Sequence, residues 1–92
     1  MSMSKITVKY LSEKEILEKE VRSWPTWSCE VSEFPWEYIE QESCYILEGQ
    51  VDITTIDGKI VSIGPGDFVV FPRGLKCTWK VRQAVYKHFS FG

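Results

Sequence analysis

The sequence has little from which to build helices, because it contains one alanine and four leucines. It has no apolar run near the roughly 20 residues of a membrane-spanning helix, and no basic start followed by an apolar segment typical of a signal peptide. A basic surplus is also missing, since the formal net charge is −2. We therefore expect a cytoplasmic protein that binds neither membranes nor nucleic acid.

Disulfide and zinc patterns are absent as well. The three cysteines, Cys29, Cys44 and Cys77, are separated by 15 and 33 residues and form no CxxC motif. Their number is odd, so at least one of them cannot pair within the chain. The sequence predicts free and mostly buried thiols in a reducing compartment.

What is present favours β-structure. Nine valines, eight isoleucines, five threonines and thirteen aromatic residues suit a pleated surface. Ninety-two residues are enough for one core. We expect one all-β domain over 1–92, with an N-terminal strand and helix at about 5–23 and a barrel at about 24–91.

One short helix is predicted after residue 11. Ser12 and Glu15 fit a capping box, and Leu11 and Ile16 are placed to clamp the helix start. Pro25 is predicted to end the helix, because the residue before a proline avoids helical geometry. We expect this helix to pack on the outside of a sheet.

Short strands separated by turns are predicted from residue 24 onward. Phe34, Trp36 and Tyr38 fall on one face of a strand, residues 42–48 form another strand that ends at Gly49, and Asp57-Gly58 is a strong hairpin signal. Further strands are predicted at 51–54, 60–63, 68–71, 75–82 and 85–91. Seven or eight such strands indicate a sandwich or a barrel.

Charge is segregated along the chain. Residues 30–48 hold six glutamates and no lysine or arginine, whereas residues 73–87 hold five basic residues and no acid. One interpretation is that the two segments attract each other within the fold or across a dimer. The other is that the basic segment attracts an acidic substrate.

Two segments resemble the conserved motifs of cupins. Residues 42–49, ESCYILEG, resemble the second half of cupin motif one, and residues 66–74, GDFVVFPRG, resemble motif two. The pattern is most similar to small single-domain cupins related to the ureidoglycine aminohydrolase-type family. The resemblance implies a cupin double-stranded β-helix, a jelly-roll barrel, with one short N-terminal helix.

The usual cupin metal ligands are missing from this pattern. In the resemblance, the paired histidines of motif one correspond to Trp36 and Tyr38, its glutamate to Glu42, and the motif-two histidine to Cys77. Indole is not a metal ligand and neutral phenol is a poor one, so two ligands remain where three or four are needed. We predict no metal and no other cofactor. The only histidine, His88, lies outside both motifs.

Candidate site residues follow from the same positions. Glu42 and Cys77 are the candidate catalytic residues: a carboxylate at the barrel mouth could act in acid–base chemistry, and a thiol could act as a nucleophile with His88 or Lys87 nearby. Each could instead be a structural carboxylate or an inert buried thiol. The candidate ligand-binding residues, each of which could also serve packing alone, are Trp36, Tyr38, Cys44, Trp79 and His88.

Three functions are compatible with this sequence. The first is a metal-free barrel that binds a small organic molecule in its interior. The second is an enzyme of small-metabolite metabolism, with aminohydrolase-like or other acid–base chemistry on Glu42 and Cys77. The third is a structural homo-oligomer or partner-binding module with a vestigial pocket. Exposed edge strands favour a homodimer in each case.

Overall fold

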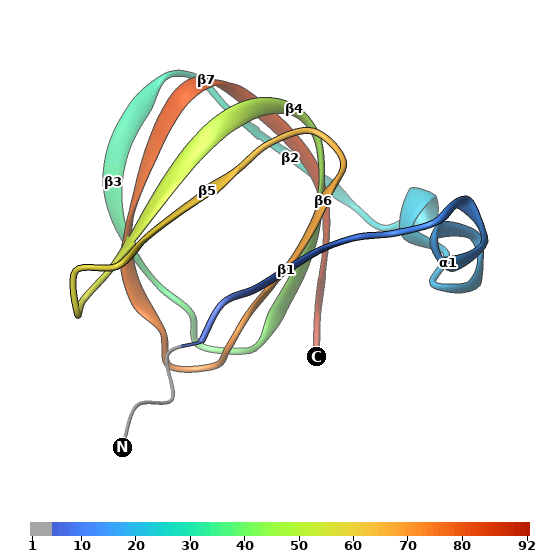
Figure 1. Cartoon of the computed structure of the whole chain (residues 1–92), viewed down its shortest axis with the longest axis horizontal. Coiled ribbons are helices and arrows are strands. Elements are labelled where there is room, and N and C mark those ends of the chain that lie inside the picture. The colour runs from blue at the N-terminus through green and yellow to red at the C-terminus, as the bar shows by residue number, and fades with distance from the viewer. Residues whose placement is uncertain (1–4) are drawn as a thin grey trace.

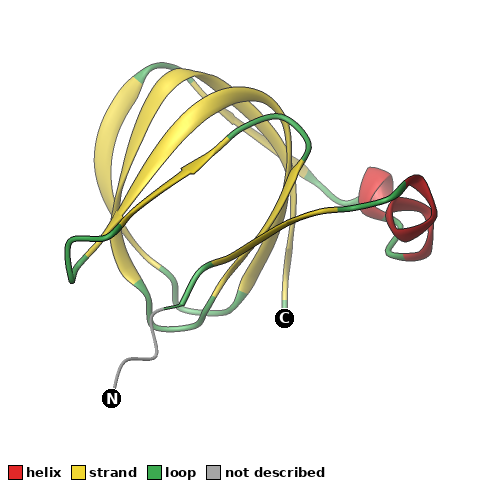
Figure 2. Cartoon of the chain, viewed as in Figure 1, coloured by secondary structure: helices red, strands yellow, loops and turns green. Residues whose placement is uncertain are grey.

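The computed structural model describes residues 5–92, and its elements are mostly strands (Figures 1 and 2). In chain order they are β1 (Thr7–Tyr10), α1 (Glu13–Glu18), the 3-10 helix η1 (Val21–Ser23), β2 (Thr26–Cys29), β3 (Ser32–Glu37), β4 (Glu42–Thr55), β5 (Ile60–Ile63), β6 (Asp67–Phe71) and β7 (Lys76–Phe91). The prediction of a mostly β fold with one short helix is confirmed.

All seven strands belong to one antiparallel sheet in the order β1-β6-β4-β7-β2, with β5 also paired to β4 and β3 also paired to β7. The two long strands change neighbours along their length. The first part of β4 pairs with β6 and its second part with β5, while the first part of β7 pairs with β3 and its second part with β2. Because β4 and β7 bend, the two halves of the sheet face each other and close a jelly-roll barrel (Figure 1).

The bend in β4 is located at Gly49. The register between β4 and β7 shifts between Ile46 and Val51, and Gly49 has a φ of +104°. A Cβ atom at Gly49 would lie 2.5 Å from the carbonyl oxygen of Ala84 on β7, so only glycine fits this close approach. The prediction that a strand ends at Gly49 is therefore wrong, because the strand bends and continues. The predicted break between 82 and 85 is likewise a continuous part of β7.

The barrel interior holds the main hydrophobic core. Leu75, which directly precedes β7, points into it together with the alternate β7 residues Cys77, Trp79 and Val81. The other buried members are Tyr38, Cys44, Ile46, Val51, Ile53, Ile63, Val69, Phe71 and Val85.

The helix packs on the outside of the barrel, as predicted. Its capping box is present: the Glu15 N–H donates to Ser12 Oγ over 3.2 Å, and the Ser12 N–H donates to Glu15 Oε1 over 3.0 Å. Leu11, Ile16, Val21 and Phe68 form a second buried cluster. The apolar run of β6 serves both sides of the sheet, because Phe68 belongs to this outer cluster and Val69 to the barrel core.

The helix is shorter than the sequence suggested. It ends at Glu18 rather than near Pro25, because Glu20 adopts a left-handed conformation with a φ of +54°. This turn allows Val21 to be completely buried against the sheet. No helix within residues 5–92 is long and apolar enough to cross a membrane.

The acidic and basic segments meet on the outer surface of the barrel. In the β3–β7 register Glu33 lies opposite Lys80 and Glu37 opposite Lys76. Inside the barrel, Glu42 of the acidic segment also forms an ion pair with Lys87 of the basic segment over 2.8 Å. The segregated charges thus attract each other within the fold, which is the first of the two interpretations of the sequence.

Candidate ligand-binding cavity

A cavity of about 250 Å³ lies between the two halves of the barrel. Seven of its nine lining residues are aromatic, and the other two are a glutamate and a lysine: Trp27, Phe34, Trp36, Tyr38, Glu42, Trp79, Lys87, Phe89 and Phe91. Pockets for drug-sized ligands occupy roughly 300–1,000 Å³. This cavity therefore suits a molecule of metabolite size.

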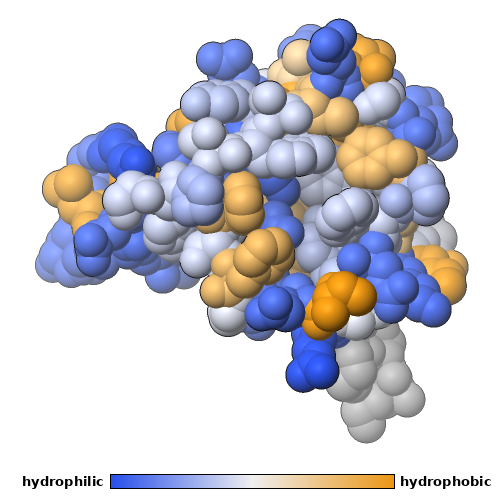
Figure 3. Space-filling view, turned by 180° about the vertical axis from the view of Figure 1, so that it is seen from behind, coloured by the Kyte–Doolittle hydropathy of each residue, from blue (hydrophilic) through white to orange (hydrophobic). Residues whose placement is uncertain are grey.

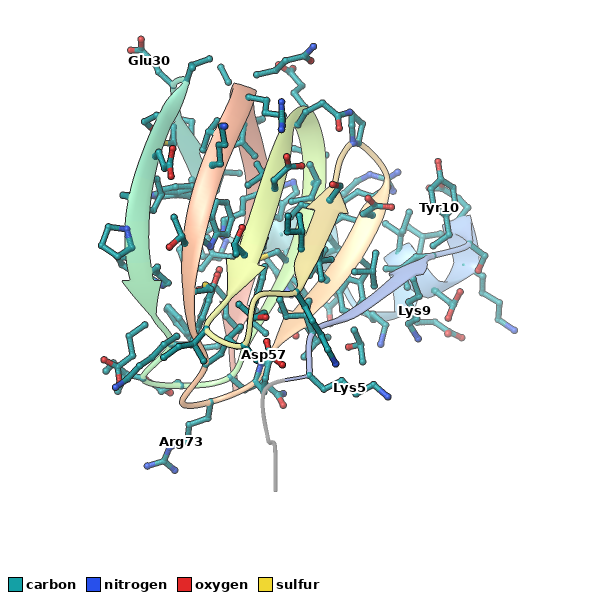
Figure 4. The ribbon with its side chains drawn as sticks, turned by 60° about the vertical axis from the view of Figure 1, so that its left-hand side comes forward. Lys5, Lys9, Tyr10, Glu30, Asp57 and Arg73 are labelled. Carbon is teal, nitrogen blue, oxygen red and sulfur yellow. The ribbon has the colours of Figure 1, made fainter. Side chains whose placement is uncertain are left out.

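The cavity opens at the end of the barrel where β3 leads into β4. A second hollow of about 140 Å³ adjoins it and shares Trp36, Tyr38, Glu42 and Phe91 as lining residues. The Tyr38 carbonyl accepts a hydrogen bond from the Gly74 N–H, so this opening lies at the Arg73 end of the barrel (Figure 4). Glu30, in the turn between β2 and β3, marks the opposite end.

A buried ion pair forms the polar part of the cavity. Lys87 Nζ lies 2.8 Å from Glu42 Oε2, and the two side chains are 6% and 8% exposed. In the register of β4 and β7, Lys87 lies opposite Ile46, and its long side chain reaches along the sheet to Glu42. A charge removed from water needs such a partner, because burying it alone costs several kcal/mol.

Two indole rings complete the surroundings of the Lys87 ammonium. Nζ lies 5.0 Å from the ring centroid of Trp27 and 4.7 Å from that of Trp79. Trp27 is the cross-strand partner of Lys87, whereas Trp79 comes from the other half of the barrel. The aromatic faces attract the cation electrostatically, and this attraction strengthens where water is excluded.

Cys44 contacts both members of the ion pair. Its thiol donates to Glu42 Oε2 over 2.9 Å and accepts from Lys87 Nζ over 3.2 Å. Burial raises the pKa of Cys44 far above its ordinary value, so the sulfur keeps its proton at neutral pH. Cys44 is therefore a hydrogen-bonding member of the cluster rather than a nucleophile.

The aromatic wall is held by stacking and one hydrogen bond. Tyr38 stacks on Phe71 with ring centroids 4.6 Å apart, and Trp79 stacks on Phe34 at 6.1 Å. Trp79 Nε1 donates to the Tyr38 hydroxyl over 3.0 Å. Burial raises the pKa of Tyr38 well above its usual range, so the phenol keeps its proton. No residue within 5–92 accepts a hydrogen bond from this hydroxyl.

The structure brings most of the predicted site residues together. Glu42, Trp36, Tyr38 and Trp79 all line the cavity, and Cys44 contacts Glu42 directly.

Two of the predicted site residues lie elsewhere. Cys77 faces the barrel interior opposite Trp36, but it is part of the packed core and does not line the cavity that Glu42 lines. Burial raises the pKa of Cys77 to about 11. His88 points to the outer face of β7, with Nδ1 2.9 Å from the Trp24 carbonyl oxygen, because it follows the inward-facing Lys87.

Lys87 is the principal residue of the cavity that the sequence analysis named only as a possible neighbour of the Cys77 thiol and not as a site residue. The sequence does carry a signal for it, since Val85, Lys87, Phe89 and Phe91 alternate with His88 and Ser90. A lysine on the apolar face of a strand indicates a buried cation with a partner. Trp27 and Phe34 were also missing from the predicted site, although both share this cavity.

The donor set does not fit the metal that typical cupins bind. Trp36 and Tyr38 offer no suitable ligand, Cys77 lies outside the cavity, and Glu42 is paired with the Lys87 ammonium. Within residues 5–92, no group of three histidine, cysteine, aspartate or glutamate side chains converges as a metal would require.

Comparison with known proteins identifies the family. The barrel is that of a cupin. The family model of the EutQ-like cupin domain matches residues 17–89. The chain belongs to the EutQ-like cupin domain family.

Solved structures agree with this assignment. A DUF861 family protein from Thermotoga maritima is 45% identical with a TM-score of 0.94, over 96% of this chain and 100% of its own. The Clostridium difficile EutQ protein is 22% identical with a TM-score of 0.67, over 97% and 68% of the two chains. An RmlC-like cupin from Shewanella frigidimarina is 15% identical with a TM-score of 0.55, over 72% and 64%. The last two likenesses show the fold alone. No curated protein matches the chain significantly.

Proposed function

We propose that this barrel binds a small organic molecule in its interior cavity and does so without a metal. The observation that carries the proposal is the buried Glu42–Lys87 pair in the wall of an otherwise aromatic cavity. A buried ion pair contributes little net stability compared with apolar packing. Its position beside open space therefore supports a role in recognition.

The cavity also offers unused hydrogen-bonding capacity. Both hydrogen bonds to the Glu42 carboxylate end on Oε2, and within residues 5–92 no buried side-chain nitrogen or oxygen atom lacks a partner. Oε1 is therefore exposed to the open space and can accept a hydrogen bond. The Tyr38 hydroxyl can donate one. Aromatic walls with one acceptor and one donor are suited to orient a small polar organic molecule.

Catalysis is the second candidate function. Aminohydrolase-like or other acid–base chemistry on Glu42 and Cys77 has less support, because Cys77 lies outside the cavity and a pKa of about 11 keeps it protonated. Glu42 and Lys87 are the titratable pair that faces the open space. A structural module with a vestigial pocket is the third candidate, and it predicts that no molecule binds.

The proposed setting is a homodimer in the cytoplasm. Free cysteines suit a reducing compartment. Within residues 5–92, strand β1 pairs on one side only, and Trp36, Ile39 and Phe91 are exposed near the cavity opening. Apolar residues on the rear face lie in separate groups among polar ones (Figure 3). Light scattering should give twice the chain mass of 10.7 kDa; a constant single-chain mass at all concentrations contradicts the dimer.

Ligand-detected NMR tests the proposed function. We expect saturation transfer from the protein to at least some members of a panel of small cationic, neutral and anionic aromatic fragments. Trp36→Ala should abolish the transfer, because the Trp36 indole lines both hollows. The fold should tolerate this substitution, since the Trp36 side chain is half exposed. Val31→Ala, an exposed apolar position outside the cavity, is the control. Absence of transfer to every fragment contradicts the proposal.

A further inference from the structure

The opening of the cavity is lined by acidic residues. Glu37, Glu40 and Glu42 line the second hollow, called the outer hollow below. Within residues 5–92, the only cationic side chain that lines the cavity or the outer hollow is that of Lys87. The charge of Lys87 is already balanced by Glu42 over 2.8 Å. The outer hollow therefore presents surplus negative charge to an incoming molecule.

The interior of the cavity is already shaped to hold one ammonium group. Lys87 Nζ lies about equally far from the Trp27 and Trp79 ring centroids, at 5.0 and 4.7 Å, with a carboxylate oxygen beside it. An ammonium between aromatic faces and next to a carboxylate is a favourable arrangement in a desolvated site.

A second set of the same components remains available near the opening. Trp36 and Phe91 are 51% and 57% exposed, and neither ring faces a cation within the described part of the chain. The Glu42 side chain is 92% buried and lines this hollow, and within residues 5–92 both hydrogen bonds to its carboxylate go to Oε2, so Oε1 can accept one from a ligand. Glu40 adds a carboxylate at the edge of the hollow.

We infer that the molecule bound here is a small organic cation, an ammonium carried on a short apolar or aromatic group. This inference rests on the proposed function and specifies its ligand class. The ammonium lies among Trp36, Phe91 and the Glu42 carboxylate, and the apolar group fills the inner cavity. A carboxylate ligand would face three glutamates at the opening and compete with Glu42 for Lys87.

Three probes of one shape and different charge test the inference. Benzylamine, benzyl alcohol and benzoate present a cation, a neutral group and an anion on the same ring at pH 7. In tryptophan fluorescence titrations we expect benzylammonium to bind about tenfold more tightly than benzyl alcohol, the effect of one charge-assisted hydrogen bond. Benzoate should bind most weakly.

The outcomes separate the two proposals. Tightest binding of benzoate, or equal binding of all three probes, overturns the cationic ligand class and leaves a binding cavity in place. If none of the three probes binds, and the fragment panel also shows no transfer, the proposed function itself fails.

Matched variants test whether the negative charge at the cavity opening causes the preference for benzylammonium. Glu40→Gln removes one carboxylate at an exposed position and leaves the Lys87 pair intact. It should weaken benzylammonium binding about two- to fivefold, the range of one exposed ion pair, and leave benzyl alcohol unchanged. Glu30→Gln, an exposed glutamate at the other end of the barrel, should change neither (Figure 4). Equal effects of Glu40→Gln and Glu30→Gln on benzylammonium contradict the inference.

Discussion

Lys87 Nζ and Glu42 Oε2 lie 2.8 Å apart inside the barrel, although the two residues are separated by 45 positions in the sequence. The β4–β7 pairing joins them, because it places the end of the last strand beside the start of β4. The Lys87 ammonium also donates a hydrogen bond to Cys44 and lies over the rings of Trp27 and Trp79. The pair thus connects the closure of the barrel to the chemistry of its cavity.

A double-mutant cycle measures the coupling of this pair. Lys87→Met should lower the free energy of unfolding by about 3–5 kcal/mol, because it leaves the buried Glu42 carboxylate without its partner. Glu42→Gln should also destabilise, since it leaves the ammonium unpaired. The double variant should be more stable than the sum of the single effects predicts, as measured by urea unfolding.

The exposed pair Arg82–Asp52 supplies the control for this cycle. Arg82 is more than half exposed, so Arg82→Met should cost at most about 1 kcal/mol. Strictly additive effects of Glu42→Gln and Lys87→Met would contradict a coupled buried pair.

Gly49→Ala tests the bend in β4. The new Cβ would meet the Ala84 carbonyl oxygen at 2.5 Å in addition to the strain of a φ of +104°, so we expect a loss of about 3 kcal/mol or more. Gly74→Ala is matched to it, with a φ of +86° and open space around the new Cβ. It should cost only about 1–2 kcal/mol. Equal losses in thermal or urea unfolding would show that the close approach is unimportant.

Thiol labelling tests the environments of the cysteines. At pH 8 a disulfide reagent such as DTNB should label the half-buried Cys29 first, while Cys44 and Cys77 react slowly because burial keeps them protonated. Cys29→Ser should remove the fast phase. Rapid reaction of more than one thiol in the folded protein would contradict these environments.

The Cys77 thiol also gives stability a pH dependence. Its pKa in the folded protein, about 11, lies above the ordinary value of 9.0, so the unfolded chain loses this proton first. The contribution of the protonated Cys77 thiol to the free energy of unfolding is complete below pH 9 and is lost as the pH rises toward 11. Urea midpoints measured across this range should therefore fall more steeply for the wild type than for Cys77→Ala. Parallel pH profiles would contradict the raised pKa.

Metal analysis tests the fit of the donor set. Elemental analysis of the purified protein should find well below one equivalent of iron, manganese, nickel or zinc, because residues 5–92 place no suitable set of ligands around Glu42. Added zinc or manganese should not raise the melting temperature, whereas a metal at 100 times its Kd would add about 2.7 kcal/mol of stability. One equivalent of bound metal would contradict the account.

The fold was largely predictable from the sequence because its signals are local. The alternation at Leu75, Cys77 and Trp79, the Asp57-Gly58 turn and the Ser12–Glu15 capping box each involve neighbouring residues. The bend at Gly49 was read as a strand end, since a glycine that closes a strand and a glycine that kinks it have the same local pattern. The close approach of Ala84 that distinguishes them comes from β7, far along the chain.

The candidate site was predictable only in part. Strand parity and the family resemblance selected Glu42, Trp36 and Trp79, which line one cavity in the structure. Parity gives the face of a strand but not the depth along the barrel, so it could not separate Cys77 in the packed core from the cavity wall. The pairing of Lys87 with Glu42 was missed because a lysine is usually solvated, and its carboxylate partner lies 45 positions away in the sequence.

The most direct test of the binding cavity follows the four indole N–H signals in a ¹H–¹⁵N NMR titration with benzylamine. Trp27, Trp36 and Trp79 line the cavity, whereas Trp24 packs outside the barrel with its ring centroid 6.3 Å from that of Phe68. We predict saturable shifts of the three cavity signals and an unchanged Trp24 signal. Unchanged cavity signals at millimolar benzylamine, or equal shifts of all four, would contradict a binding site inside this barrel.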